Sequence, residues 1–269
     1  MVDPKNNESH DDDVKEHDGV TFEVEEPSIE AGKPVRHKGV YILPNLFTTG
    51  ALFSAFYAII AAMNHLWEPA CIAIFAAMIL DGLDGRVARL TNTQSAFGAE
   101  YDSLSDCVAF GVAPALVVYA WSLSVLGKIG WMVAFIYAAC AALRLARFNV
   151  QIDTADKRFF TGLPSPSAAA VVTGLVWAAS DFDLNGQDHW VALIAAAITA
   201  MAGLLMVSNF KYNSFKEIDF HGRVPFVAIL IIVFIFAIVF TDPPRVLWLV
   251  AMSYAVSGPL LSLRRKSPL

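Results

Sequence analysis

The sequence predicts an all-α protein: a polytopic membrane bundle of about eight transmembrane helices. Composition supports this, since 56% of the 269 residues are apolar and only 16% are charged. A soluble domain carries roughly a quarter charged residues. Several apolar runs also reach about 20 residues, the length at which a helix crosses a bilayer. Helices are expected because each span must satisfy its backbone polar groups within its own segment.

Eight apolar segments are the candidates for these helices. In chain order they cover residues 41–63, 67–90, 98–121, 127–148, 163–181, 188–207, 223–240 and 243–262. The turn-like stretches "DFDLNGQD" and "TDPP" separate the fifth segment from the sixth and the seventh from the eighth. Such short breaks predict two tight helical hairpins.

The distribution of Lys and Arg predicts how the helices cross the membrane, because cytoplasmic loops are enriched in these residues. With eight spans, the basic residues fall in the termini and in alternate loops: Lys33, Arg36, Lys38, Arg86, Arg89, Arg144, Arg147, Lys157, Arg158, Lys211, Lys216, Arg223, Arg264, Arg265 and Lys266. The opposite loops hold only Lys128 and Arg245. Both termini are therefore expected in the cytoplasm.

Charge also divides the chain into three parts. Residues 1–38 hold eleven Asp and Glu against five Lys and Arg, and are predicted to form a disordered acidic cytoplasmic tail. Residues 39–263 are predicted to form the transmembrane domain that carries the functional site. Residues 264–269 are predicted to be a short basic cytoplasmic tail.

Four aspartates stand at the cytoplasmic ends of the second and third predicted spans. Asp81 and Asp84 are three residues apart, and Asp102 and Asp106 are four apart, so each pair shares one face of its helix. Adjacent antiparallel helices would bring all four carboxylates to a similar depth, where they would repel each other. Divalent cations with hard oxygen ligands would resolve this repulsion, and two of them could grip a phosphate.

Small residues and an arginine lie among these aspartates. Gly85 and Ala88 leave room for a ligand beside the helix, Gly98 opens the next helix, and Arg89 offers a cation for phosphate oxygens. An alternative is a structural charge network, with Asp81 paired to Arg89 or Asp84 to Arg86, inside a transporter.

These residues together resemble the signature of a known family. The pattern Asp81-x2-Asp84-Gly85-x2-Ala88-Arg89-x8-Gly98-x3-Asp102-x3-Asp106 places eight fixed residues over 26 positions. It is similar, position for position, to the CDP-alcohol phosphatidyltransferases. In that family a CDP-linked lipid or alcohol loses CMP, and its phosphoryl group passes to a hydroxyl acceptor.

The resemblance implies a role for each residue. Asp81 and Asp102 would bridge two divalent cations, Mg²⁺ or Mn²⁺. Asp84 would complete one metal site and Asp106 the other, with Asp106 also acting as the general base. The residues implied to bind CDP-diacylglycerol are Gly85, Ala88, Arg89, Ser95 and Gly98, with Asn45 and Thr48 of "LPNLFTT" closing the nucleotide pocket.

Three further stretches bear on the acceptor. "ALRLARFNVQ" (142–151), "KRFFTGLPSPSAAA" (157–170) and "SNFKYNSFKEIDF" (208–220) resemble the bacterial phosphatidylserine synthases of this family. The resemblance implies that CDP-diacylglycerol and L-serine are the substrates. Two alternatives stay open: a phosphatidylglycerolphosphate synthase, which uses glycerol 3-phosphate, and a non-enzymatic membrane transporter.

The carboxylate of serine requires a cation, best a guanidinium that binds both oxygens. Arg147 is the first candidate, with Asn149 beside it, and Arg144, Lys211 and Lys216 are the others. The resemblance further implies a homodimer in the inner, cytoplasmic membrane of a bacterium, with the active site on the cytoplasmic side. Membrane lipids are expected partners, and nucleic acid is not.

Overall fold

The computed structural model describes residues 26–30, 33–37, 42–91, 95–151, 159–213 and 226–265. The chain divides into two compact units, Met1–Val40 and Tyr41–Leu269. The first unit contains an antiparallel hairpin of β1 (Glu26–Glu30) and β2 (Lys33–His37), in which Ser28 faces Val35. The sequence did not predict this hairpin inside the acidic tail. Residues 1–25 and 266–269 lie outside the described part of the chain.

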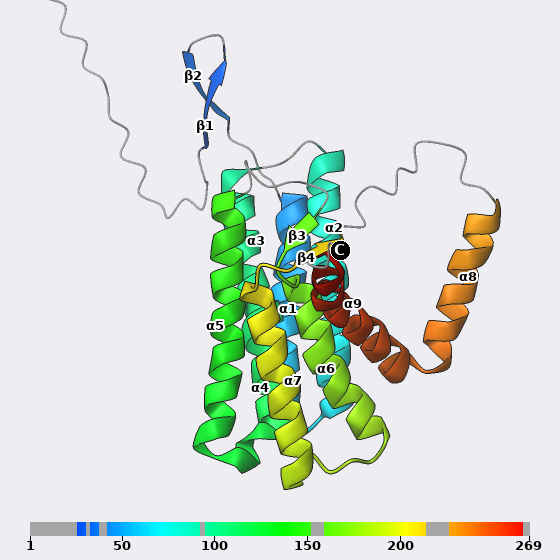
Figure 1. Cartoon of the computed structure of the whole chain (residues 1–269). Helices are drawn as coiled ribbons and strands as arrows, with labels where there is room; N and C mark the ends of the chain where they lie inside the picture. Colours follow the sequence, from blue (N-terminus) through cyan, green and yellow to red (C-terminus); the bar gives the residue numbers. More distant parts are fainter. Residues whose placement is uncertain are drawn as a thin grey trace, which may run out of the picture. The chain divides into compact units, whose positions relative to one another are not determined.

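The second unit is almost entirely helical. From α1 to α7 its long helical segments run in alternating directions, with α3, η1 and α4 together forming one of these segments (Figure 1). Its helices are α1 (Ile42–Met63), α2 (Trp67–Leu90), α3 (Ala96–Asp106), the π-helix η1 (Cys107–Val112), α4 (Ala113–Trp121), the 3₁₀-helix η2 (Leu123–Leu126), α5 (Lys128–Gln151), α6 (Ser165–Asp181), α7 (His189–Val207), α8 (Phe226–Thr241) and α9 (Pro243–Arg265). The all-α prediction is confirmed, and each of the eight predicted segments overlaps a helical segment.

Five helical segments are long and apolar enough to cross a membrane: Pro44–Met63, Ala96–Trp121, Lys128–Val150, His189–Val207 and Pro243–Ser262. The chain is therefore an integral membrane protein. The other three predicted spans differ from these in charge or length. α2 carries five charged residues, whereas α6 and α8 have 17 and 16 residues. The total of eight spans stays a prediction.

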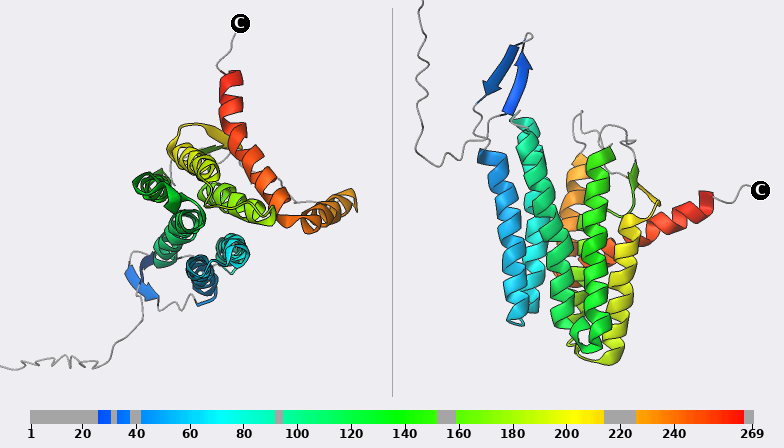
Figure 2. Two further views of the ribbon diagram at one scale, coloured as in Figure 1. Left: turned by 90° about the horizontal axis from the view of Figure 1, so that it is seen from below. Right: turned by 90° about the vertical axis from the view of Figure 1, so that its left-hand side faces the viewer.

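The side chains of α1 show how the bundle packs. Ala51, Ala55 and Ala58 are buried, at 0–2% exposure, whereas Phe53 and Phe56 are exposed. Small residues let neighbouring backbones approach closely inside a membrane, where lipid solvates the large apolar side chains. α1 accordingly packs along α2, and α5 packs against α7 (Figure 2).

The third predicted span is interrupted in its middle. Its two α-helical parts, α3 and α4, are joined by the wider turn of η1. Pro114 stands just after this turn and has no backbone N–H with which to continue the α-helical ladder. The sequence predicts one continuous span over 98–121, and the π-helical segment in its middle is a correction to that prediction.

Two short strands join the loops at the site end of the bundle. β3 (Phe159–Thr161) pairs antiparallel with β4 (Lys211–Asn213). The chain then turns at Gly162, which has a φ of +81°, and a Cβ there would lie 2.2 Å from the carbonyl oxygen of Met206. Only glycine fits this turn, which brings the start of α6 against the end of α7.

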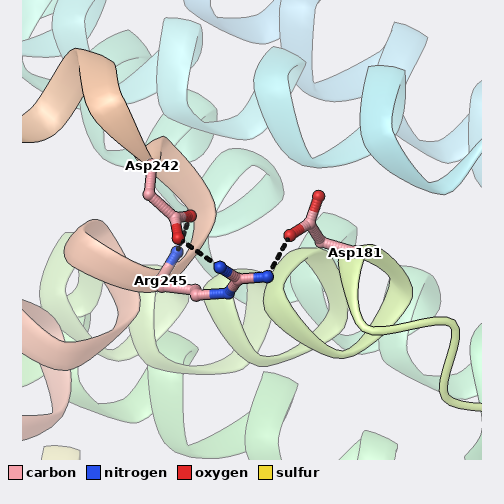
Figure 3. Close-up of polar contacts among 3 residues, drawn as sticks. All are labelled: Asp181, Asp242 and Arg245. Carbon is pink, nitrogen blue, oxygen red and sulfur yellow. Dashed lines mark hydrogen bonds and ion pairs between the residues drawn. The ribbon is translucent and has the colours of Figure 1, made fainter.

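Helix α9 packs against α6 (Figure 2), and Arg245 near the start of α9 contacts Asp181 at the end of α6. The Arg245 guanidinium lies between two carboxylates, 2.9 Å from Asp181 and 2.6 Å from Asp242 (Figure 3). Its central carbon also lies 4.1 Å from the centre of the Phe182 ring. This basic residue, on the side predicted to be poor in Lys and Arg, is thus neutralised by its neighbours.

Candidate active site

Four acidic side chains lie together where α2 approaches α3. One carboxylate oxygen from each of Asp81, Asp102 and Asp106 lies within 4.8 Å of the others. Asp84, with 5% exposure, lies beside them and its carboxyl contacts that of Asp102. The structure therefore brings all four predicted carboxylates together. The i,i+3 and i,i+4 spacings place them on the facing sides of two adjacent helices.

Asp84 is held in place by α1. Its Oδ2 accepts a 2.8 Å hydrogen bond from the Thr48 hydroxyl, and its other oxygen accepts one from the backbone N–H of Gly85. Thr48 is itself buried, and its carbonyl accepts a hydrogen bond from Ser105 on α3. A chain of hydrogen bonds therefore joins α3, α1 and α2 around the carboxylates.

A cavity of about 320 Å³ opens beside Asp84 and Asp102. All seven residues that the sequence assigned to CDP-diacylglycerol line it: Asn45, Thr48, Gly85, Ala88, Arg89, Ser95 and Gly98. They come from α1, α2 and the start of α3, so three separate stretches of sequence form one wall. Pro44 and Ala99 complete the lining.

The two glycines of this cavity serve different purposes. A Cβ on Gly85 would meet nothing within 4 Å, so the missing side chain leaves space in the cavity. A Cβ on Gly98 would lie 3.0 Å from the Ser95 hydroxyl and 3.3 Å from Asn45 Oδ1, so glycine permits a close approach there. Ser95 caps α3 by accepting a 2.9 Å hydrogen bond from the Gly98 N–H.

The basic residues proposed for serine do not share one environment. Arg144 is 8% exposed and donates a 3.0 Å hydrogen bond from Nη1 to the Ser165 hydroxyl. Its Nε is buried and has no partner among the described residues, and its charge interacts with Asp106. Arg147 instead binds Asn209 through Nη2 at 2.9 Å, beyond the end of α7.

The remaining candidates for serine binding differ from one another in their surroundings. Asn149 donates a 3.0 Å hydrogen bond to Ser103, one residue beyond Asp102. Lys211 is exposed in β4. Lys216 lies outside the described residues.

The sequence profile described as CDP-alcohol phosphatidyltransferase matches residues 41–205, a range that contains the four carboxylates and the cavity. The chain belongs to this family. The predicted family is thereby confirmed. The match ends within α7, so β4, α8 and α9 lie beyond the matched range.

Curated relatives include several CDP-diacylglycerol–serine O-phosphatidyltransferases. The protein of that name from Helicobacter pylori (strain 26695) is 39% identical over 220 residues, which cover 81% of this chain and 90% of the relative. The Mycobacterium tuberculosis H37Rv protein is 35% identical over 85% of this chain and 81% of its own length. The Bacillus subtilis protein is 34% identical over 65% of this chain and 92% of its own length.

The carboxylate cluster fits the divalent cations that the family implies. All its donors are hard oxygen atoms, which suit Mg²⁺ and Mn²⁺. Asp102 Oδ1 is buried without a hydrogen-bond partner in the described part of the chain. A metal ion would supply the partner that this oxygen atom needs. Within the same residues no Lys or Arg forms an ion pair with any of the four aspartates. The alternative network, with Arg86 or Arg89 as structural partners, is therefore not observed.

Two serines that organise this site were not predicted. Ser105 lies inside the stretch "DSLSD" and supports Thr48, whereas Ser165 lies in "GLPSPS" and binds Arg144. Their only sequence signal is their position within stretches already singled out. Both act through contacts with residues at least 21 positions away in the chain, which local spacing does not reveal.

Proposed function

We propose that this protein transfers the phosphatidyl group of CDP-diacylglycerol to L-serine, giving phosphatidylserine and CMP. The observation that carries the proposal is the cavity in which all the assigned nucleotide-binding residues meet Asp84 and Asp102. Serine is favoured as the acceptor because the H. pylori, M. tuberculosis and B. subtilis relatives carry that substrate in their names.

The proposed binding mode places the nucleotide in the cavity of about 320 Å³. Arg89 would bind phosphate oxygens, and the empty space at Gly85 would admit the ligand close to α2. Asn45 and Ser95 would contribute further polar contacts from the lining of the same cavity. The diacylglycerol part would remain in the bilayer, which explains why the site lies near the ends of membrane helices.

The carboxylates would hold two divalent cations, with Asp81 and Asp102 shared between them, Asp84 on one and Asp106 on the other. Bound cations would supply positive charge that offsets the carboxylates and the substrate diphosphate. The observed Thr48 and Gly85 hydrogen bonds to Asp84 would orient that carboxylate.

Asp106 is the proposed general base. The serine hydroxyl oxygen bonds to the lipid-side phosphorus, and the bond between that phosphorus and the bridging oxygen breaks. CMP leaves with the bridging oxygen, and the hydroxyl proton passes to Asp106. Asp106 suits this role because it lies one turn deeper than Asp102 on the same face of α3.

For the serine carboxylate, the contacts favour Arg144 over the first sequence candidate, Arg147. The guanidinium of Arg144 is buried, has an unpartnered Nε in the described structure and interacts with the Asp106 charge. The Arg147 guanidinium is engaged by Asn209 and by the Val207 carbonyl. We therefore assign Arg144 as the serine anchor and Arg147 as a structural residue.

The Lys and Arg distribution supports placing the site and both termini on the cytoplasmic side. We place the protein in the inner membrane of a bacterium. Homodimerisation is a further part of the proposal, based on the family alone.

Release of CMP tests the function directly. Purified protein in detergent micelles, with CDP-diacylglycerol and Mn²⁺, should release CMP when serine is added and stop when a chelator is added. Glycerol 3-phosphate should give no release. Release with glycerol 3-phosphate alone would instead establish the rival synthase, and release with neither acceptor would contradict the proposed transfer.

The two arginines are separated by their effect on serine dependence. Arg144→Lys should raise the KM for serine about tenfold, the effect of losing ~1.4 kcal/mol of binding. The matched control, Arg147→Lys, should leave that KM unchanged. An elevated serine KM in Arg147→Lys alone would restore Arg147 as the anchor.

A further inference from the structure

The π-helix η1 begins at Cys107, directly after the proposed base Asp106. In this wide turn the N–H of Ala113 reaches back five residues to the carbonyl of Val108. An α-helix would pair the Phe110 carbonyl with the N–H of residue 114, but that residue is Pro114 and has no N–H. The proline thus removes the α-helical donor of Phe110 and favours the wider turn.

A side chain from another helix occupies the carbonyl of Phe110. Tyr137 on α5 is completely buried and donates a 3.0 Å hydrogen bond from its hydroxyl to the Phe110 oxygen. A buried hydroxyl or carbonyl without a partner is costly inside a membrane. The Tyr137 hydroxyl and the Phe110 carbonyl each supply the partner that the other needs.

Close packing holds Tyr137 and η1 against each other. A Cβ on Gly111 of η1 would lie 3.0 Å from the Cβ of Ala141, one turn along α5 from Tyr137. On the other side of α5, a Cβ on Gly203 would lie 3.2 Å from the Cα of Tyr137. The two glycines therefore let α5 fit tightly between η1 and α7, and Tyr137 has little freedom to move.

The π turn determines the direction of Asp106 relative to the buried face of α4. One extra residue in a helix rotates the two halves by about 100° relative to each other, because a turn holds 3.6 residues. Relaxation of η1 to an α-helix would therefore turn Asp102 and Asp106 away from Asp81, or turn α4 out of its packing. Wide turns of this kind are frequent at functional sites.

We infer that Tyr137 is a positioning residue for the transfer reaction: its hydrogen bond to Phe110 maintains the π turn that directs Asp106 toward the other carboxylates. Tyr137 touches neither the carboxylates nor the cavity, and acts through the backbone of η1. The inference rests on the proposed function, in which Asp106 takes the proton from serine.

The test removes the hydroxyl alone. Tyr137→Phe should lower kcat about ten- to hundredfold, the scale expected when a catalytic group is displaced by about 1 Å. The KM for CDP-diacylglycerol should be unchanged, because the cavity of that substrate lies along α1, α2 and the start of α3. The concentration of Mn²⁺ that stabilises the protein against heating, measured without substrate, should rise because Asp106 is a proposed ligand.

Ser122→Ala is the matched control. It removes another buried hydroxyl that donates to a backbone carbonyl, that of Gly186 at 2.6 Å, in the turn after α4. It should lower the Tm to a similar extent as Tyr137→Phe while leaving kcat and the Mn²⁺ dependence unchanged. Equal losses of kcat in the two variants would show that Tyr137 contributes only to the stability of the fold, and would overturn the inference.

Pro114→Ala alters the hydrogen bonding of the same turn through the backbone, since it restores an N–H that can donate to the Phe110 carbonyl in an α-helix. It should also lower kcat, and the double variant with Tyr137→Phe should lose less than the product of the two single losses. Wild-type kcat in Tyr137→Phe, or in Pro114→Ala if the first variant does not fold, overturns the inference. In either case serine-dependent CMP release by the unaltered protein still decides the proposed function separately.

Discussion

The two ends of the helix bundle use aspartate in opposite ways. At the end where α6 meets the α8–α9 connection, Asp181 and Asp242 share the guanidinium of Arg245 (Figure 3). At the end where α2 meets α3, one carboxylate oxygen from each of Asp81, Asp102 and Asp106 lies within 4.8 Å of the others, and the ion pairs seen among the described residues belong to Arg245 instead.

This difference separates a structural charge from a functional one. Arg245 completes the charge balance of its cluster within the protein, so nothing external is needed there. The four carboxylates of α2 and α3 have no such ion pair among the described residues, and the charge of Arg144 near Asp106 offsets only part of their mutual repulsion. Such an arrangement is expected where cations and a diphosphate bind, and it supports the proposed transfer site.

The largest expected effect comes from removing one charge of the uncompensated cluster. Asp102→Asn should reduce serine-dependent CMP release by about a thousandfold or more, because a bound cation contributes several kcal/mol to the transition state. Asp181→Asn is the control at the other end. Full activity of Asp102→Asn in the presence of a chelator would show that the cluster does not hold an essential metal.

A smaller and more specific effect is expected at Asp106. Asp106→Asn should retain CDP-diacylglycerol binding while kcat falls about 10²–10⁴-fold, the usual contribution of a general base. Substrate binding is measured by equilibrium titration and turnover by CMP release. Near-normal turnover would require a different base, and simultaneous loss of Mn²⁺ binding would assign Asp106 mainly to the metal.

The hydrogen bond from Thr48 to Asp84 should contribute less again. Thr48→Val removes the hydroxyl at nearly constant volume and should lower kcat about tenfold, equivalent to ~1.4 kcal/mol for a hydrogen bond to a charged group. Thr48→Ser should restore most of the loss, since it keeps the donor. An equal loss in Thr48→Ser would attribute the effect to packing of the methyl group.

The helical segments and the carboxylate cluster could be predicted from the sequence alone. The bilayer requires apolar runs of about 20 residues, so segment boundaries are visible in composition. The spacing of Asp102 and Asp106 then places them on one helix face. Both features depend on local periodicity, which a single sequence displays.

Features that depend on distant partners were not visible. η1 interrupts a continuous apolar stretch, and only Pro114 marks it. The contact of Arg147 with Asn209 joins residues 62 positions apart, and the role of Arg147 in serine binding stays a prediction. The strands β3 and β4 likewise pair with each other although α6 and α7 separate them in the chain. Each strand has only three residues, which is too short for a recognisable alternation of apolar and polar side chains.

The smallest expected effect concerns the compensated end of the bundle. Asp181→Asn removes one of the two carboxylates at Arg245, and both side chains of that pair are more than two-fifths exposed. Water screens such a pair, so the loss of stability should be less than about 1 kcal/mol, or a Tm change of about 4 °C or less. Arg245 would keep Asp242 and its contact with the Phe182 ring. The kcat and the KM for serine should therefore be unchanged. A large fall in kcat would show that the two ends of the bundle are coupled, and that ion pairing does not distinguish a structural aspartate from a functional one in this protein.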